Sequence, residues 1–227
     1  MDDIWFLKQV DWLGELGEPE WSDLARRAVR RSFEATETIF TPTPDPQSLY
    51  LLESGRVRIY RLSPAGAEAT LGFVAPGEVF GELAAFGDYQ RESFASAQIA
   101  SVIWKLPADL FREWVRTRPR LVIEVTRQIG ERMKRVESRV ESLVFRNVRS
   151  RVALLLLELS EDFGHKEDGH LVLELGLSQE ELATLVGTTR QSVSTVIAQL
   201  KESGVLRQQG QRIELLDPAR LRELSAS

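Results

Sequence analysis

The stretch LSQEELATLVGTTRQSVSTVIAQLKESGVL, from Leu177 to Leu206, carries the most informative pattern in the chain. Ser178, with a glutamate three residues later, forms a capping box, which marks the start of a helix. Gly187 ends this helix in a tight turn, and Thr188 or Thr189 caps a second helix. Apolar residues recur at helical spacing in both segments. The pattern predicts a helix-turn-helix.

The exposed face near the start of the second helix suits recognition of base edges. Arginine pairs with guanine, glutamine pairs with adenine, and serine or threonine adapts to either. The amides of the helix N-terminus, together with Thr189, can also hold a backbone phosphate. The predicted DNA-binding residues are Thr189, Arg190, Gln191, Ser192, Ser194 and Thr195.

The residues that follow the second helix predict a β-wing from Gly204 to Leu216, with Arg207 and Arg212 near DNA phosphates. A helical hairpin used for protein contacts has the same apolar spacing and is the alternative. The polar face of the second helix and the wing favour double-stranded DNA. A net charge of −5 provides no general attraction to nucleic acid, so DNA binding must be local.

The N-terminal half has a different pattern of apolar residues and turns. Helical spacing extends from Glu20 to Ser32, and short strand-like segments follow from Phe40 to Leu106, separated by Gly and Pro turns. The segment from Leu49 to Leu62 reads as two strands around Ser54-Gly55. Several short strands at this spacing predict a small β-roll or barrel. Within it, FGELAAFGDYQRES (Phe80 to Ser93) combines two glycines, a carboxylate, an arginine and a serine, which is typical of a site for a small anion.

A long helix is predicted between these two regions. A short helix ends before Pro119, and the next one continues to about Phe145 with apolar residues spaced alternately by four and three. Such a seam with charged flanks predicts a parallel homodimer, and packing of the helix on its own domain is the alternative. The predicted dimerisation residues are Ile129, Met133, Val136, Val140 and Leu143.

The composition excludes several classes of function. The 227 residues contain no cysteine, which excludes disulfides, iron–sulfur clusters and thiolate zinc sites. The only histidines are His165 and His170, so a cupin-type metal enzyme or a haem sensor in the N-terminal half lacks its ligands. No paired carboxylates or nucleophile–base pair indicates an enzyme, and no metal site is predicted. Without a signal peptide or an apolar span, a cytoplasmic location with no membrane partner is expected.

The order of these parts resembles the cyclic-AMP receptor protein / fumarate-nitrate regulator superfamily of bacterial transcription factors. GEVFGEL (Gly77 to Leu83), the long helix and Ser178 to Leu206 carry the resemblance. It implies an α+β fold with a cyclic-nucleotide-binding-like β-roll in residues 1–118, a dimerisation helix in 119–146 and a winged helix-turn-helix in 147–227. It also implies a homodimer on a two-fold symmetric promoter site that recruits or blocks RNA polymerase, and an activator that recruits the polymerase is the expectation.

The resemblance implies a role for individual residues of the DNA-binding face. Arg190 matches the family arginine that reads a guanine. Gln191 stands where the cyclic-AMP receptor has a glutamate, and it suits adenine better. Thr195 replaces a second arginine that contacts DNA, which weakens the expected affinity. The loop from Phe163 to His170 lies where the receptor contacts the polymerase α subunit.

The resemblance also implies an effector site formed by Gly81, Glu82, Leu83, Arg91 and Ser93. Aligned without gaps, however, Glu92 falls on the arginine that binds the cyclic phosphate, and Arg91 comes one residue early. Val136 and Glu137 replace the threonine–serine pair that binds adenine. These departures favour a regulator that requires no effector. A cyclic AMP-dependent regulator is the alternative, and a different ligand in the same roll is a third possibility. Whether Arg91 or Glu92 faces the inside of the roll largely decides between them.

Overall fold

The computed structural model describes residues 4–43, 47–85, 90–174 and 176–226. Its contacts divide the chain into two compact units. The first unit comprises Met1–Arg61 and Gly72–Met133, and the second comprises Leu62–Leu71 and Lys134–Ser227.

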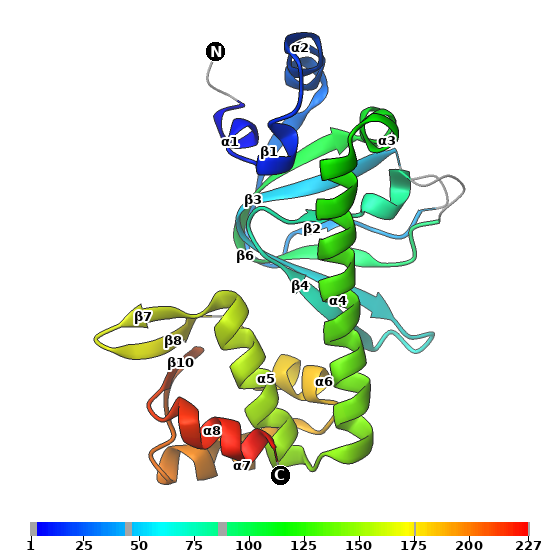
Figure 1. The fold of residues 1–227 in the computed structure, drawn as a ribbon. Helices are drawn as coiled ribbons and strands as arrows, with labels where there is room; N and C mark the ends of the chain where they lie inside the picture. Colours follow the sequence, from blue (N-terminus) through cyan, green and yellow to red (C-terminus); the bar gives the residue numbers. More distant parts are fainter. Residues whose placement is uncertain (1–3, 44–46, 86–89, 175, 227) are drawn as a thin grey trace. The chain divides into compact units, whose positions relative to one another are not determined.

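The first unit contains most of a six-stranded sheet in the order β1-β6-β3-β4, with β2 on β6 and β5 on β3 (Figure 1). Its strands are β1 (Val29–Phe33), β2 (Thr38–Phe40), β3 (Ser48–Leu62), β4 (Glu68–Val74), β5 (Val79–Phe80) and β6 (Phe94–Pro107). The predicted β-roll is therefore confirmed as the N-terminal sheet domain. Its helical segments are α1 (Trp5–Lys8), η1 (Asp11–Leu13), α2 (Glu18–Arg27), η2 (Glu82–Ala85) and α3 (Ala108–Thr117).

Two boundaries in this unit differ from the sequence-based expectation. The helix expected to reach Ser32 ends at Arg27, because Val29–Phe33 pairs with β6 as an edge strand. The segment expected to form two strands is the single strand β3. Gly55 has φ +94° and lies where the pairing register shifts, so it forms a bulge rather than a turn.

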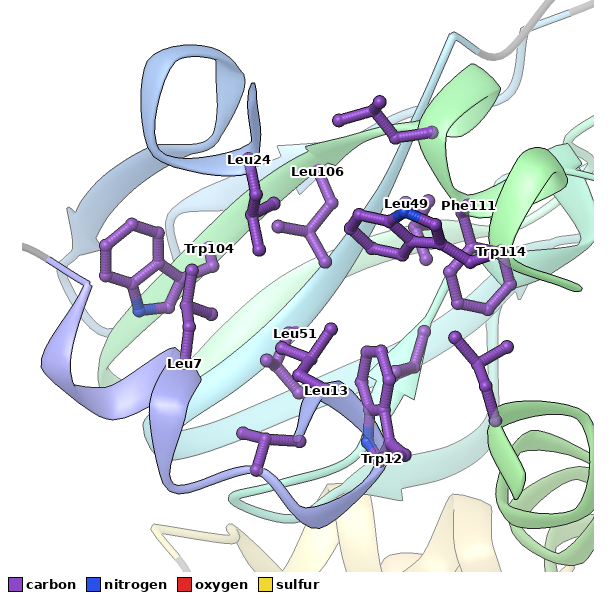
Figure 2. Close-up of a cluster of buried hydrophobic side chains, with 14 of the residues drawn as sticks. Leu7, Trp12, Leu13, Leu24, Leu49, Leu51, Trp104, Leu106, Phe111 and Trp114 are labelled. Carbon is purple, nitrogen blue, oxygen red and sulfur yellow. The ribbon is translucent and has the colours of Figure 1, made fainter. Parts of the chain in front are cut away.

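Alternation along β3 separates two hydrophobic clusters. Leu49 and Leu51 join a cluster under the N-terminal helices and α3, which also contains Trp104 and Trp114 (Figure 2). Tyr50 and Leu52 join the other cluster, on the opposite side of the strand. The second cluster also contains Phe40, Val57, Val74, Phe80, Ala95 and Ile103.

The long helix α4 (Pro119–Phe145) spans about 40 Å. In the first unit its buried residues Leu121 and Val125 join the cluster under the N-terminal helices. Gln128 is also buried, and its side chain accepts a hydrogen bond from the Val79 amide at 3.0 Å. This face of α4 is therefore fixed against its own domain, while the face that carries Met133 remains exposed.

The second unit is built around the apolar helix α5 (Val148–Phe163), whose N-terminus is capped by Asn147. The other helices are α6 (Gln179–Val186), α7 (Arg190–Glu202) and α8 (Pro218–Ser225). A four-stranded sheet in the order β7-β8-β10-β9 contains β7 (His165–Glu167), β8 (His170–Glu174), β9 (Leu206–Gln209) and β10 (Arg212–Leu215). The expected polar loop before His170 thus includes a strand, β7, which forms a hairpin with β8.

Candidate nucleic-acid interface and β-roll site

The helix-turn-helix forms from the local signals in its sequence. The Ser178 hydroxyl accepts a hydrogen bond from the Glu181 amide at 3.2 Å, and the Glu181 carboxylate accepts one from the Ser178 amide at 2.8 Å. This capping box starts α6 at Gln179. Gly187 ends the helix with φ +71°, a left-handed conformation that favours glycine.

Close packing at the turn gives Gly187 a second role. A β-carbon at this position would lie 2.6 Å from the Leu143 Cδ2 atom of α4. Leu143, a predicted dimerisation residue, therefore packs against the turn of the helix-turn-helix and is about half exposed. The sequence pattern assigned Leu143 to the seam alone, because this contact joins residues far apart in the chain.

The recognition helix α7 has one buried and one exposed face. Val193, Val196, Ile197 and Leu200 are buried. The Thr189 hydroxyl caps the helix by accepting a hydrogen bond from the Ser192 amide at 3.2 Å, and it lies 2.9 Å from the Ser192 hydroxyl. Both hydroxyls therefore belong to the cap, which orients the first turn of the helix and its free amides.

The other predicted DNA-binding residues lie on the exposed face. Arg190, Gln191, Ser194 and Thr195 are all exposed. The Thr195 hydroxyl donates to the Gln191 carbonyl at 3.0 Å. Within the described parts of the chain, Arg190 and Ser194 have no hydrogen bond or ion pair through their side chains. Ala198, which the sequence reasoning missed, is also exposed, and its spacing of three from Thr195 was the available signal.

The cations of the predicted wing are paired with carboxylates. Arg207 lies 2.9 Å from Glu214. Arg212 lies 2.8 Å from Glu167 and 2.6 Å from Glu174. The hydrogen bonds that Arg212 donates to Glu167 and Glu174 raise its pKa above the ordinary value, and the bond to Glu167 contributes most. Binding of a phosphate by either arginine would therefore compete with these carboxylates.

In the β-roll, Arg91 rather than Glu92 faces the interior. The Arg91 side chain is 7% exposed and its guanidinium donates to the Ser48 carbonyl at 2.6 Å. Its guanidinium carbon lies 4.1 Å from the centre of the Phe40 ring. Glu92 is exposed and pairs with Arg61.

The orientation of Arg91 follows from a backbone bridge. The Arg91 amide donates to the Thr43 carbonyl at 2.8 Å, and the Thr43 amide donates to the Arg91 carbonyl at 2.9 Å. This bridge fixes which side chain turns inward, and it answers the question between Arg91 and Glu92 that the sequence left open. Residues 86–89 of the stretch from Phe80 to Ser93 lie outside the described residues.

The carboxylate of Glu82 forms an ion pair with Arg132 within the first unit. Glu82 is 7% exposed, and both of its carboxylate oxygens lie 3.4 Å from Arg132 Nη1 on α4. Arg132 also donates to the Val79 carbonyl. Sequence reasoning missed Arg132, because it lies off the apolar seam and 50 residues from Glu82.

The other candidates around Glu82 complete the site. Gly81 has φ +68°, and a β-carbon there would lie 2.9 Å from Arg91 Nη2. Leu83 is exposed and Ser93 is half-buried. Arg91 thus lies against Gly81, whose carbonyl is 3.4 Å from Arg91 Nη2, while the adjacent Glu82 pairs with Arg132 on α4. Ser93 follows two residues after the arginine.

On α4, the exposed stripe contains Met133, Val136, Val140 and Leu143. Ile129 is half-buried and packs against the core of the first unit. Glu137 is exposed beside the stripe. The exposed seam therefore consists mainly of the residues in the second half of α4.

A partly buried charged cluster joins α4 and α5 in the second unit. The Ser138 hydroxyl donates to the Glu158 carboxylate at 3.1 Å. Burial raises the pKa of Glu158 above its ordinary value, although this hydrogen bond opposes the shift. Arg139 lies near Glu158, and burial lowers the pKa of Arg139.

The described residues contain no group of three or more histidine, cysteine, aspartate or glutamate side chains arranged to hold a metal ion. None of their helices combines the length and the apolar character needed to cross a membrane.

A cyclic-nucleotide-type sheet domain, a long helix and a winged helix-turn-helix define a DNA-binding transcription regulator. The sequence profile of the cyclic nucleotide-binding domain matches residues 30–118, and that of the Crp-like helix-turn-helix domain matches residues 150–224. The chain belongs to the CRP/FNR superfamily. The resemblance to this superfamily that was inferred from the sequence is thus confirmed.

Individual relatives and a solved structure are similar to the chain over most of its length. The chain is 33% identical over 189 residues to the CRP-like cAMP-activated global transcriptional regulator of Mycobacterium tuberculosis, covering 83% of this chain and 84% of the relative. It is 34% identical over 199 residues to the transcriptional regulator SdrP of Thermus thermophilus, covering 86% and 94%. A crystal structure of a CRP/FNR-family regulator from Thermus thermophilus matches with a TM-score of 0.72 and 32% identity, covering 88% of this chain and 99% of that one.

Proposed function

We propose that this regulator reads a two-fold symmetric promoter site in double-stranded DNA with the exposed face of α7. The observation that carries the proposal is the pair of exposed side chains Arg190 and Ser194. Within the described residues neither side chain has a hydrogen bond or an ion pair with the protein. Both lie near exposed Gln191 on a helix that Thr189 caps. Arginine suits guanine and glutamine suits adenine. Thr189 and Ser192, which form the cap, orient the amides that would bind a backbone phosphate.

The proposed active form is a homodimer that pairs through α4. Met133, Val136, Val140 and Leu143 supply the seam, and Ile129 contributes its exposed part. A seam with this period suits a parallel pair of helices. Two copies of α7 would then enter successive major grooves, about one helical turn apart.

The remaining proposed roles are carried over from the superfamily. The protein acts as an activator that recruits RNA polymerase, and the segment from Phe163 to His170, which contains β7 and the turn into β8, is the proposed contact. Its strand β7 is exposed throughout, which suits a contact surface. We assign the regulator no enzymatic activity and a cytoplasmic location, with residues 1–118, 119–146 and 147–227 as its three functional parts.

We further propose that DNA binding requires no effector. The inward orientation of Arg91 alone would favour an effector site, but three features of the surrounding contacts support the reading without an effector. Arg132 already neutralises Glu82, the carboxylate that would bind a ribose. Arg91, the cation that would bind a phosphate, donates to the Ser48 carbonyl and stacks on Phe40. On α4, Val136 offers an adenine no hydrogen bond.

The alternative is a regulator that depends on cyclic AMP. It is favoured by the inward orientation of Arg91 beside Gly81 and Glu82, because this set combines a phosphate-binding cation with a ribose-binding carboxylate. The mycobacterial relative is named as cAMP-activated. When bound, the nucleotide would supply a phosphate for Arg91 and a ribose hydroxyl for Glu82.

An electrophoretic mobility shift on a palindromic site, with and without cyclic AMP, tests both statements. We expect specific binding under both conditions. Arg190→Ala should weaken it by about 1–3 kcal/mol per half-site. Lys201→Ala removes the same charge from the far end of α7 and is the matched control. Absence of specific binding under both conditions would refute the main proposal, and a large gain with cyclic AMP would favour the alternative.

A further inference from the structure

Thr195 differs from its neighbour Ser194 in how its hydroxyl is used. Both residues are exposed on α7. The Thr195 hydroxyl donates to the Gln191 carbonyl one turn earlier, at 3.0 Å. This back-bond holds the hydroxyl against the helix and restricts the first side-chain torsion of Thr195. The hydroxyl proton of Thr195 is thereby committed to the protein, so Thr195 is a poor donor to a base.

The group that Thr195 presents outward is consequently its γ-methyl. Threonine carries two γ-substituents, and once the hydroxyl is turned to the backbone the methyl is the one left exposed. Ala198, three residues later, is also exposed and adds a second methyl on the neighbouring turn. Thr195 and Ala198 thus form a small apolar strip on a face whose other members, Arg190, Gln191 and Ser194, are polar.

An apolar strip on a recognition helix has a specific complement in DNA. In the major groove, thymine is the base that presents a methyl group, at C5, and threonine and alanine methyls contact it. We propose that Thr195 determines specificity by contacting a thymine methyl, with Ala198 extending the same surface. The proposal rests on the proposed function of α7 as the reading helix. It replaces the expectation that Thr195 acts as a hydrogen-bonding reader.

The test combines protein variants with a change of one methyl in the DNA. A palindromic duplex is first selected from random DNA with the full-length protein. Symmetric thymine pairs are then replaced, one pair at a time, by deoxyuridine, which lacks only the C5 methyl. Thr195→Ser keeps the hydroxyl and removes the methyl, whereas Thr195→Val keeps a methyl and removes the hydroxyl. Affinities are measured by fluorescence anisotropy at one fixed salt concentration.

At one symmetric pair, we expect deoxyuridine to weaken wild-type binding by about fourfold per methyl, or about fifteenfold for both half-sites. Thr195→Ser should lose a similar factor on the normal duplex and should no longer respond to deoxyuridine there. Thr195→Val should retain the response. Equal wild-type affinity for every deoxyuridine duplex would overturn the proposal. A response kept by Thr195→Ser and lost by Thr195→Val would also overturn it.

Arg190→Ala on the same selected duplex distinguishes a failure of the Thr195 assignment from a failure of α7 as the reading helix. If Arg190→Ala abolishes specific binding while every deoxyuridine duplex binds as tightly as the normal one, the assignment of Thr195 fails and α7 remains the reading helix. If Arg190→Ala and both Thr195 variants bind the selected duplex like the wild type, α7 does not read the site. The proposed function then fails together with the inference.

Discussion

Replacing Val140 by aspartate is expected to dissociate the proposed homodimer. Val140 lies on α4 and is 56% exposed within one chain, and its neighbours along the stripe, Val136 and Leu143, are 45% and 49% exposed. A parallel partner helix would cover these side chains. In such a pair, the two copies of a residue at a seam position lie close to each other, so one substitution changes the interface twice.

The expected size of the effect follows from these exposures. Full burial of a valine side chain contributes about 1.5–3 kcal/mol, so covering the 56% that is exposed contributes about 1–1.5 kcal/mol per copy. Losing this in both copies removes about 2–3 kcal/mol. Two facing carboxylates add a repulsion of about 1–4 kcal/mol. The total of about 3–7 kcal/mol corresponds to a rise in the dimer dissociation constant of roughly a hundredfold to a hundred-thousandfold.

Sedimentation equilibrium across nanomolar to micromolar protein measures this constant directly. Lys134→Asp is the matched control, because it places a carboxylate on the same helix at an exposed position off the apolar stripe. The wild type and the control should have twice the mass of one chain, and Val140→Asp should have the mass of one chain. If Val140→Asp remains dimeric over the whole range, or if the control dissociates equally, the α4 seam is not the dimer interface.

Three further substitutions test local features by urea unfolding. Gly187→Ala should lower the free energy of unfolding by about 2–3 kcal/mol, because it places a side chain on a left-handed backbone and against Leu143. Adding Leu143→Ala should recover part of this loss. If the effects of the two substitutions are simply additive, the contact between Gly187 and Leu143 is contradicted. Arg91→Met should lower the free energy of unfolding by about 1–3 kcal/mol, since it removes the buried hydrogen bond to the Ser48 carbonyl. Arg61→Met, which removes the partner of exposed Glu92, should change it by no more than about 0.5 kcal/mol. Because burial raises the pKa of Glu158, the folded chain binds this proton more tightly than the unfolded chain, and the contribution of Glu158 becomes less favourable as pH rises above about 4.5. The stability of Glu158→Gln relative to the wild type should therefore increase from pH 4 to pH 7, and a difference that is constant with pH would refute the assignment.

The elements that were predicted correctly are those determined by local chemistry. The capping box of Ser178 and the left-handed Gly187 fix both ends of α6 through contacts within a few residues, so the sequence alone places this helix. The same holds for the exposed face of α7, whose cap at Thr189 sets the orientation of every later residue. Helical periodicity then separates buried Val193 from exposed Arg190 without knowledge of the rest of the fold.

The features that were missed depend on contacts between distant residues. Helical spacing from Glu20 to Ser32 did not exclude a strand, because β1 exists only through its pairing with β6. Gly55 was read as a turn, since a glycine in a bulge and a glycine in a turn look alike until the partner strand is known. The orientation of Arg91 depends on its bridge to Thr43, which the local sequence does not encode.

The contacts of α4 with the first unit bear on the proposal that DNA binding requires no effector. A ligand shifts a conformational equilibrium only by its difference in affinity for the two states. In this chain, Gln128 and Arg132 already join α4 to the backbone of Val79, and Arg132 pairs with Glu82. A nucleotide that recruited Glu82 would have to replace this ion pair, in which the carboxylate side chain is only 9% exposed. Its net gain from these contacts would be reduced by that loss, and this reduction is the physical basis of the proposal that DNA binding requires no effector.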